Sequence, residues 1–260
     1  MNGAFSSPLL PFLTGALVAV FTVLLAMQWR RRRKPHQLWW TIGFALYSAA
    51  AFLEFAMMRA GSWSPGVFRI YALMSATLVA VLAQGSVSLV THRPFWPRAY
   101  LAYNAVCAVI FAYGVFTAKL VSAALAHPLL ASYAPLGGTA GTYPRFLSLL
   151  LTIPAALVLF WTAARSVVRF LRKKEFAYRM WANVLIGGAT LVIASGGGLA
   201  KAGNTTLFYI TEIVAAVLYF AGVLLAGTLK PGADKLRAEH AAARAAAAAQ
   251  SGREAGGGTV

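Results

Sequence analysis

The stretch LLPFLTGALVAVFTVLLAMQWRRRRK, residues 9–34, decides the fold of this chain. Its first part, residues 9–28, carries no charged side chain. It is long enough to cross the hydrocarbon core of a bilayer, which is about 30 Å thick and takes about 20 helical residues to span. The basic residues at 30–34 follow the apolar stretch, whereas a secretory signal peptide carries its basic residues first. We therefore expect a transmembrane helix that is retained.

Six further stretches have the same character, and the whole chain is 60% hydrophobic and 11% charged, with a mean hydropathy of +0.68. Because an unpaired backbone amide costs several kcal/mol in lipid, such stretches are expected to be helices. The sequence predicts an all-α membrane protein with seven transmembrane helices in residues 1–229 and an Ala/Gly-rich tail in residues 230–260. The predicted segments are 9–28, 38–58, 70–90, 99–118, 146–164, 180–200 and 205–229.

The basic residues predict the orientation of the chain. A net charge of +17 is compatible with nucleic-acid binding, but these charges alternate between the connections instead of forming one surface. With seven crossings, eighteen of the 23 Lys and Arg residues fall on one side, and the positive-inside rule places that side in the cytoplasm. We expect an external N-terminus, a cytoplasmic C-terminus and the lipid bilayer, not nucleic acid, as partner. The external basic residues are Arg59, Arg69, Lys119, Arg145 and Lys201.

An offset of 142 residues brings similar features of the chain into line. Arg30 falls on Arg172, and Trp39 falls on Trp181. The first three helices would then repeat as the last three, giving a 3+1+3 parallel repeat around a lone fourth helix. The alternative is that basic loops and interfacial tryptophans recur in any multi-pass protein.

Glu54 and Glu212 are the acidic residues within the predicted spans, and buried charges in a membrane mark functional sites. Both lie toward the predicted external side, at the level of Arg69 and Lys201, and Tyr209 shares the helical face of Glu212. These five residues predict an outward-facing polar vestibule that binds a small ligand or a proton.

Two other interpretations of these acids remain open. Glu54 would pair with Arg69, or Glu212 with Lys201, only to fix the register of the helices. Alternatively, one of the glutamates faces the lipid headgroups and has no particular role. The tyrosines are open to a similar alternative, because tyrosines near a membrane boundary often belong to the interfacial aromatic belt.

Enzyme motifs are absent from the sequence. The four histidines are scattered and far apart, so no paired-histidine metal motif exists, and no Walker loop or dinucleotide fingerprint occurs. Cys107 is the single cysteine, which excludes a disulfide framework and a thiolate metal site. The last predicted span contains no lysine that could carry a retinal. We expect a non-enzymatic protein without a catalytic residue, metal or cofactor.

The longest external connection, residues 119–144, combines an apolar stretch with prolines and a glycine pair. Long loops of this kind often carry function, although a tolerated insertion is equally ordinary. We expect an external lid or an interfacial hairpin.

Two regions of the chain share a pattern of aromatic, basic and small residues with known sequences: Trp63, Ser64, Pro65, Phe68, Arg69, Tyr71, Asn183, Leu185, Ile186, Lys201, Gly203, Leu207, Phe208, Tyr209, Glu212 and Gly222. In these residues the chain resembles a group of uncharacterised bacterial seven-helix integral membrane proteins. The resemblance implies the same architecture and a location in the bacterial cytoplasmic membrane, and it implies no activity. The 3+1+3 arrangement is also similar to that of sugar-facilitator and PQ-loop proteins, although no predicted span contains a Pro-Gln pair.

These observations favour a small-molecule transporter or facilitator in the cell membrane, with Glu54, Arg69 and Glu212 lining the vestibule. A membrane sensor or receptor module that binds a ligand outside and signals to a cytoplasmic or membrane partner is the second interpretation. A structural or assembly role is the third.

Overall fold

A computed structural model describes residues 8–91, 93–126, 134–137, 142–173, 177–201 and 205–228 of the chain. These residues form helices and connections, so the predicted all-α class is confirmed for this part of the chain. Seven long helices cover the seven predicted segments, and two short helical turns lie in the long connection. The elements are α1 (Leu9–Arg32), α2 (Pro35–Ala60), α3 (Pro65–Val90), α4 (Phe95–Thr117), α5 (Ser122–Leu125), η1 (Ala134–Leu136), α6 (Arg145–Lys173), α7 (Ala177–Lys201) and α8 (Thr205–Thr228).

Six of the long helices are long and apolar enough to cross a membrane: α1, α2, α3, α4, α6 and α8. Helix α7 contributes a shorter apolar stretch, Met180–Ile193, within the residues included in this comparison. The multi-pass membrane character is confirmed, and the seventh crossing stays a prediction.

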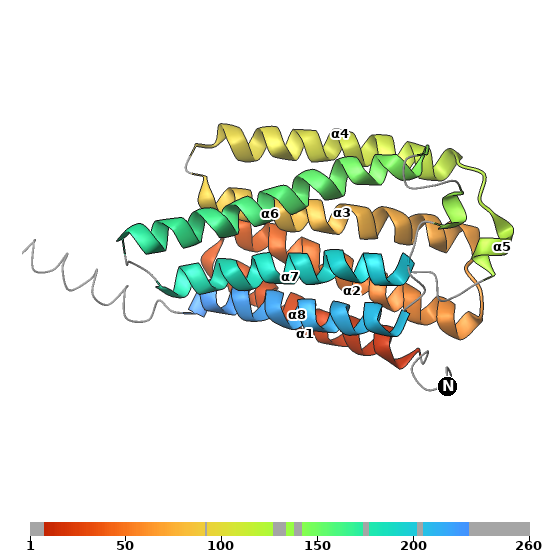
Figure 1. The fold of residues 1–260 in the computed structure, drawn as a ribbon, viewed down its shortest axis with the longest axis horizontal. Coiled ribbons are helices and arrows are strands. Elements are labelled where there is room, and N and C mark those ends of the chain that lie inside the picture. The colour runs from red at the N-terminus through yellow and green to blue at the C-terminus, as the bar shows by residue number, and fades with distance from the viewer. Residues whose placement is uncertain are drawn as a thin grey trace, which may run out of the picture.

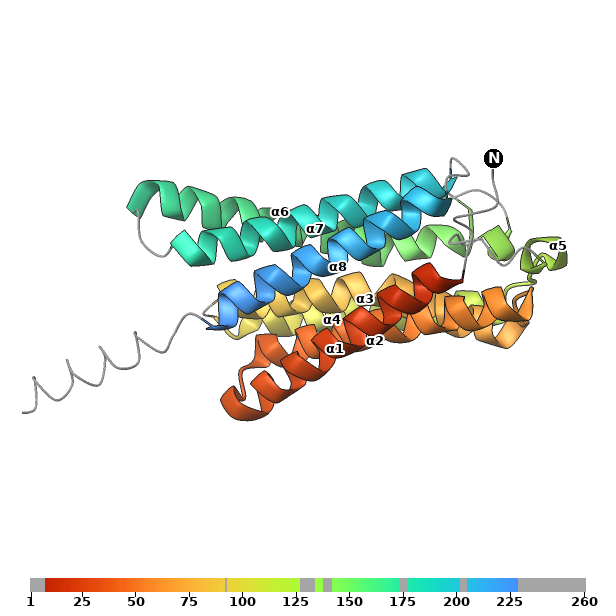
Figure 2. The same cartoon turned by 90° about the horizontal axis from the view of Figure 1, so that it is seen from below.

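The long helices lie side by side along the long axis of the molecule (Figure 1). In the order α1, α2, α3, α6, α7 and α8, each helix contacts the next one. Helix α8 also contacts α1, so these six helices close into a ring. Helix α4 packs on the outside of this ring against α3 and α6. Figure 2 shows the same bundle from below, with α8 crossing between α7 and α1.

Successive long helices run in opposite directions, so α1 begins and α8 ends at opposite ends of the bundle (Figures 1 and 2). We call the end where α1, α3, α6 and α8 finish the basic end, because α1 carries Arg30, Arg31 and Arg32 in its last turn. At the opposite end lie α5 and the turn between α2 and α3. The orientation of these two ends across a membrane stays a prediction.

The turn from α2 to α3 at the opposite end is set by local sequence signals. Gly61 follows α2 with φ 78°, a left-handed conformation that favours glycine. The Ser64 hydroxyl then accepts a hydrogen bond from the Val67 amide at 3.4 Å, and Pro65 occupies the first turn of α3. The chain therefore reverses direction within a few residues, which brings the end of α2 and the beginning of α3 together.

Glycines allow close helix contacts within the ring. A Cβ added at Gly222 on α8 would lie 2.8 Å from the Ala182 carbonyl oxygen and 2.8 Å from Ile186 Cγ1 on α7. A Cβ at Gly43 on α2 would lie 2.6 Å from Leu82 Cδ2 on α3. Small residues at contacts of this kind let helices associate by close packing where lipid provides no hydrophobic driving force.

Candidate functional site

Glu54 on α2 is only 4% exposed. Its Oε1 accepts a hydrogen bond from the hydroxyl of Tyr71 on α3. Its Oε2 is buried and has no hydrogen-bond partner. A buried polar atom left unpaired costs about 1–3 kcal/mol, and more when it is charged, so this oxygen needs an explanation.

Glu212 enters the same region from α8. Its side chain is half-buried as a whole, but its Oε2 is buried and has no hydrogen-bond partner. The backbone carbonyl of Glu212 accepts a hydrogen bond of 3.0 Å from the hydroxyl of Tyr47 on α2. This bond fixes α8 against α2 at the level of Glu212.

A second contact between the same helices lies closer to the opposite end, where the Tyr209 hydroxyl contacts Met58 Sδ at 3.6 Å. Tyr47, Glu54 and Met58 follow one another at spacings of seven and four residues, which places them on one face of α2. Because the first and last of them contact α8, Glu54 between them faces α8 as well.

Glu212 follows Tyr209 by three residues on the same face of α8, so Glu54 and Glu212 lie on the facing sides of α2 and α8. We call Glu54 and Glu212 the acid pair. Tyr47, Tyr71 and Tyr209 form a tyrosine shell around the pair, and each of these tyrosines is buried. The structure therefore brings together three of the five predicted site residues that no single stretch of sequence places side by side.

Arg69 and Lys201 are the other two predicted site residues. The Nη2 of Arg69 donates to the carbonyl of Ala118 at 3.1 Å, just after α4, and its place in a vestibule with Glu54 stays a prediction. Arg69 thereby fastens the outer end of α3 to the end of α4. Lys201 is the last residue of α7, and its side chain lies outside the described residues.

The sequence prediction missed Tyr47. Tyr47 lies seven residues before Glu54, two helical turns along the same face, and this spacing was available in the sequence. The spacing does not show which other helix packs against this face.

Trp63 also belongs to this region and connects it to the long connection between α4 and α6. Its indole is 4% exposed and lies 4.9 Å from the Tyr71 ring, centroid to centroid. Its backbone amide donates to the Leu125 carbonyl of α5 at 2.8 Å. A continuous path of contacts therefore runs from α5 through Trp63 and Tyr71 to Glu54.

The described part of the long connection folds back on itself. The Val121 amide donates to the Pro135 carbonyl at 2.9 Å, which joins α5 to η1, and Leu125 and Leu136 are buried. The lid or interfacial hairpin stays a prediction, because residues 127–133 and 138–141 of this connection lie outside the described residues.

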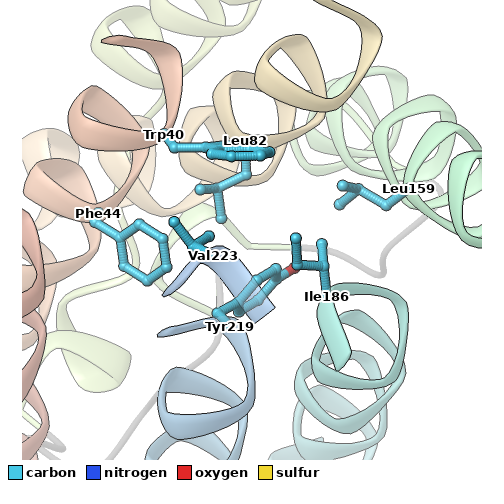
Figure 3. Close-up of a pocket in the computed structure, with 7 residues that line it drawn as sticks. All are labelled: Trp40, Phe44, Leu82, Leu159, Ile186, Tyr219 and Val223. Carbon is cyan, nitrogen blue, oxygen red and sulfur yellow. The ribbon is translucent and has the colours of Figure 1, made fainter. Parts of the chain in front are cut away.

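A small apolar gap inside the ring lies nearer the basic end than the acid pair does, and it leaves no room for a water molecule. Tyr219, two turns after Glu212, points its hydroxyl to Thr190 Oγ1 at 2.8 Å, so its polar atom is already partnered. Figure 3 shows that the remaining side chains around it are apolar. The pocket reads as a packing gap between five helices and not as a polar site. Its lining residues are Trp40, Phe44, Leu82, Leu159, Ile186, Tyr219 and Val223.

Within the part of the chain that the structure describes, no group of three or more His, Cys, Asp or Glu side chains is placed to hold a metal ion. Cys107, on α4, is buried and free. The acid pair is therefore the site of chemical interest among the described spans.

No protein-family model matches the chain, and searches of curated proteins and of solved structures find no match either. The class of the protein rests on its own helices. It is a multi-pass helical membrane protein, defined by the length and hydropathy of α1, α2, α3, α4, α6 and α8.

Proposed function

We propose that this protein is a non-enzymatic transporter or facilitator for a small molecule, with the acid pair as its binding or coupling site. The observation that carries the proposal is the meeting of Glu54 and Glu212, from helices far apart in the sequence, with one buried and unpartnered oxygen on each. An ionisable side chain within a membrane span is expensive, and two that converge without satisfying each other indicate a functional role. A purely structural ion pair with Arg69 does not explain Glu54, because Arg69 bonds elsewhere.

The proposal includes a membrane orientation in which the acid pair lies in the external half, with the N-terminus outside and the C-terminus in the cytoplasm. It also includes the 3+1+3 repeat, with α1–α3 and α6–α8 as the two units. The closed ring of these six helices and the position of α4 outside it support this arrangement. In such a protein, movement of one unit against the other would expose a site that both units contribute to, as the acid pair does.

The test is uptake into liposomes that contain the purified protein. Light scattering follows osmotic swelling in a panel of small solutes (glycerol, glucose, glycine and betaine), and an internal pH dye follows proton movement. We expect the native protein to admit at least one solute or proton, and Glu54→Gln and Glu212→Gln to abolish this flux. The matched control is Thr190→Val, which removes the buried bond to Tyr219 in the apolar pocket and should leave the flux intact. Equal flux in native protein and both glutamine variants would reject the site.

A second candidate, a membrane sensor, is favoured by the contacts from α5 through Trp63 and Tyr71 to Glu54. They connect an external segment to the centre of the bundle, which is what a receptor for an external ligand needs. Truncation after Lys230 separates the two candidates. A sensor would keep ligand binding and lose its partner, whereas a transporter would keep its flux.

A further inference from the structure

We propose that the acid pair binds one unit of positive charge that the protein itself does not supply, either a proton or a monovalent metal cation, held between Glu54 and Glu212. This inference rests on the proposed function and gives its site a ligand class. The shared chemistry is a single positive charge accepted by carboxylate oxygens in a buried site.

Each carboxyl group of the acid pair has a buried oxygen without a hydrogen-bond partner. Glu54 is more than nine-tenths buried, its Oε1 takes the Tyr71 hydroxyl, and its Oε2 has no partner; the buried Oε2 of Glu212 also has none. Carboxylate oxygens accept hydrogen bonds or coordinate a cation. Two ionised carboxylates cannot hydrogen-bond to each other, because both are acceptors only. A proton or a cation between them would satisfy both at once.

The two carboxyl groups would carry two negative charges if both were ionised. Two ionised carboxylates side by side in a medium of low dielectric constant repel strongly, and removal of one charge relieves this repulsion. The shell from α2, α3 and α8 consists of Tyr47, Tyr71 and Tyr209, whose hydroxyls can donate and accept hydrogen bonds. The tyrosine hydroxyls therefore adjust hydrogen bonding around the pair but add no positive charge.

Several basic residues lie at the end of the bundle opposite to the basic end, where the acid pair is found. Arg69 on α3 donates to the Ala118 carbonyl, and Arg59 at the end of α2 is exposed. Lys119, just after α4, is exposed, and Arg145 is the first residue of α6 at the same end of the bundle. Lys201 at the end of α7 also belongs to that region, and its side chain lies outside the described residues. The experiment must therefore separate an external charge from a charge supplied by Lys201.

The size of the charge follows from the ligand set. Divalent cations such as Ca²⁺ take six to eight oxygen ligands, commonly from several carboxylates. The described residues here bring together two carboxyl groups and no third acid. Two carboxyl groups that share one positive charge leave a net charge of minus one, which the Tyr71 hydroxyl stabilises by donating to Glu54 Oε1.

The experiment uses the full chain in lipid and needs no transport. Infrared spectroscopy detects the C=O stretching band of a protonated carboxylic acid, and thermal unfolding is measured in chloride salts of Li⁺, Na⁺, K⁺ and N-methylglucamine at equal ionic strength. The variants are Glu54→Gln, Glu212→Gln and Lys201→Gln. If one glutamine variant fails to fold, the other carries the test, since either substitution removes half of the pair.

Two results would support the inference. A protonated carboxyl band that is present in the native protein and lost in a glutamine variant identifies the proton. No such band, together with an unfolding temperature several degrees higher in one alkali salt than in N-methylglucamine and without this difference in the glutamine variants, identifies a metal cation. In either case Lys201→Gln should behave like the native protein.

Two results would overturn the inference: neither signal in the native protein, or loss of the signal in Lys201→Gln, which would make the lysine the partner. The outcome is independent of the flux assay. If the band or the salt effect is found but no flux occurs in liposomes, the charge site stands and the transporter proposal falls.

Discussion

Tyr71 shows at the scale of a single residue how the acid pair depends on its neighbours. Its hydroxyl donates to Glu54 Oε1, and its ring packs against Trp63. The hydroxyl of this side chain forms a hydrogen bond with the acid, and its ring stabilises the turn between α2 and α3 by packing. Substitutions can therefore separate the two roles.

Tyr71→Phe keeps the ring and removes the hydroxyl, so Glu54 Oε1 loses its hydrogen-bond donor while the packing stays. We expect the free energy of unfolding to fall by about 1–3 kcal/mol, because a buried acceptor is left unpaired. The measurement is thermal or denaturant unfolding in a mild detergent. Tyr113→Phe is the matched control, since Tyr113 is 70% exposed, and it should change the stability far less. Equal effects of the two variants would contradict the role of the hydroxyl.

The coupling between the two acids can be measured by a double-mutant cycle. Glu54→Gln and Glu212→Gln should not be additive, because each substitution changes the electrostatic environment of the other residue. We expect an interaction energy of about 0.5–3 kcal/mol in unfolding experiments. Additivity within about 0.3 kcal/mol would show that the carboxyl groups do not interact.

At the scale of the elements, the contact between α7 and α8 is the most extensive in the bundle, and it positions Glu212. Gly222 is the point of closest approach described above. Without a side chain there, the backbone of α8 lies directly against the Ala182 carbonyl and Ile186.

Gly222→Ala should therefore loosen this contact. The added Cβ meets a backbone carbonyl that cannot turn aside, and we expect a loss of about 1–3 kcal/mol in stability from overpacking. Gly188→Ala on α7 is the control, because a Cβ there meets nothing within 4 Å, and the substitution should be neutral or stabilising. A stable Gly222→Ala protein would mean that the helices can separate at no cost.

The link between Trp63 and α5 gives a second test at this scale. Trp63→Ala removes the indole from between Tyr71 and Phe68 but keeps the amide that binds Leu125. We expect faster hydrogen exchange at the beginning of α3 and in α5, since the buried contact that holds them is lost. Exchange in α4 should not change. Unchanged protection in α3 and α5 would show that the indole does not hold this end together.

At the scale of the whole molecule, the odd number of predicted crossings places the two termini of the chain in different compartments, and the predicted orientation places the turn between α2 and α3 outside. A cysteine at Ser62, in the turn between α2 and α3, should react with an impermeant maleimide in intact cells. A cysteine at Arg93, between α3 and α4, should react only after permeabilisation. The native Cys107 is buried and provides a low background. Labelling of both sites from outside would reject the orientation.

The sequence by itself determined the medium, the helices and the position of the charges. Length and hydropathy are local properties, and the demand that every backbone amide be paired in lipid turns each apolar stretch into a helix. The predicted segments therefore match seven long helices, with boundaries shifted by a few residues toward signals such as Pro35 and Pro65. The position of Glu54 and Glu212 in the opposite half of the bundle from the basic run followed from the same counting.

Only the tertiary structure decided which side chains meet. Lipid and the interior of a membrane protein are both apolar, so hydropathy does not show which face of a helix meets another helix. The placement of Glu54 opposite α8, with Tyr47 fixing the level of Glu212, depends on a contact between residues 165 positions apart. The same is true of Arg69, whose charge suggested an acid as partner but whose guanidinium reaches the carbonyl that ends α4. Contacts between distant helices result from packing of the whole ring, and no local pattern contains them.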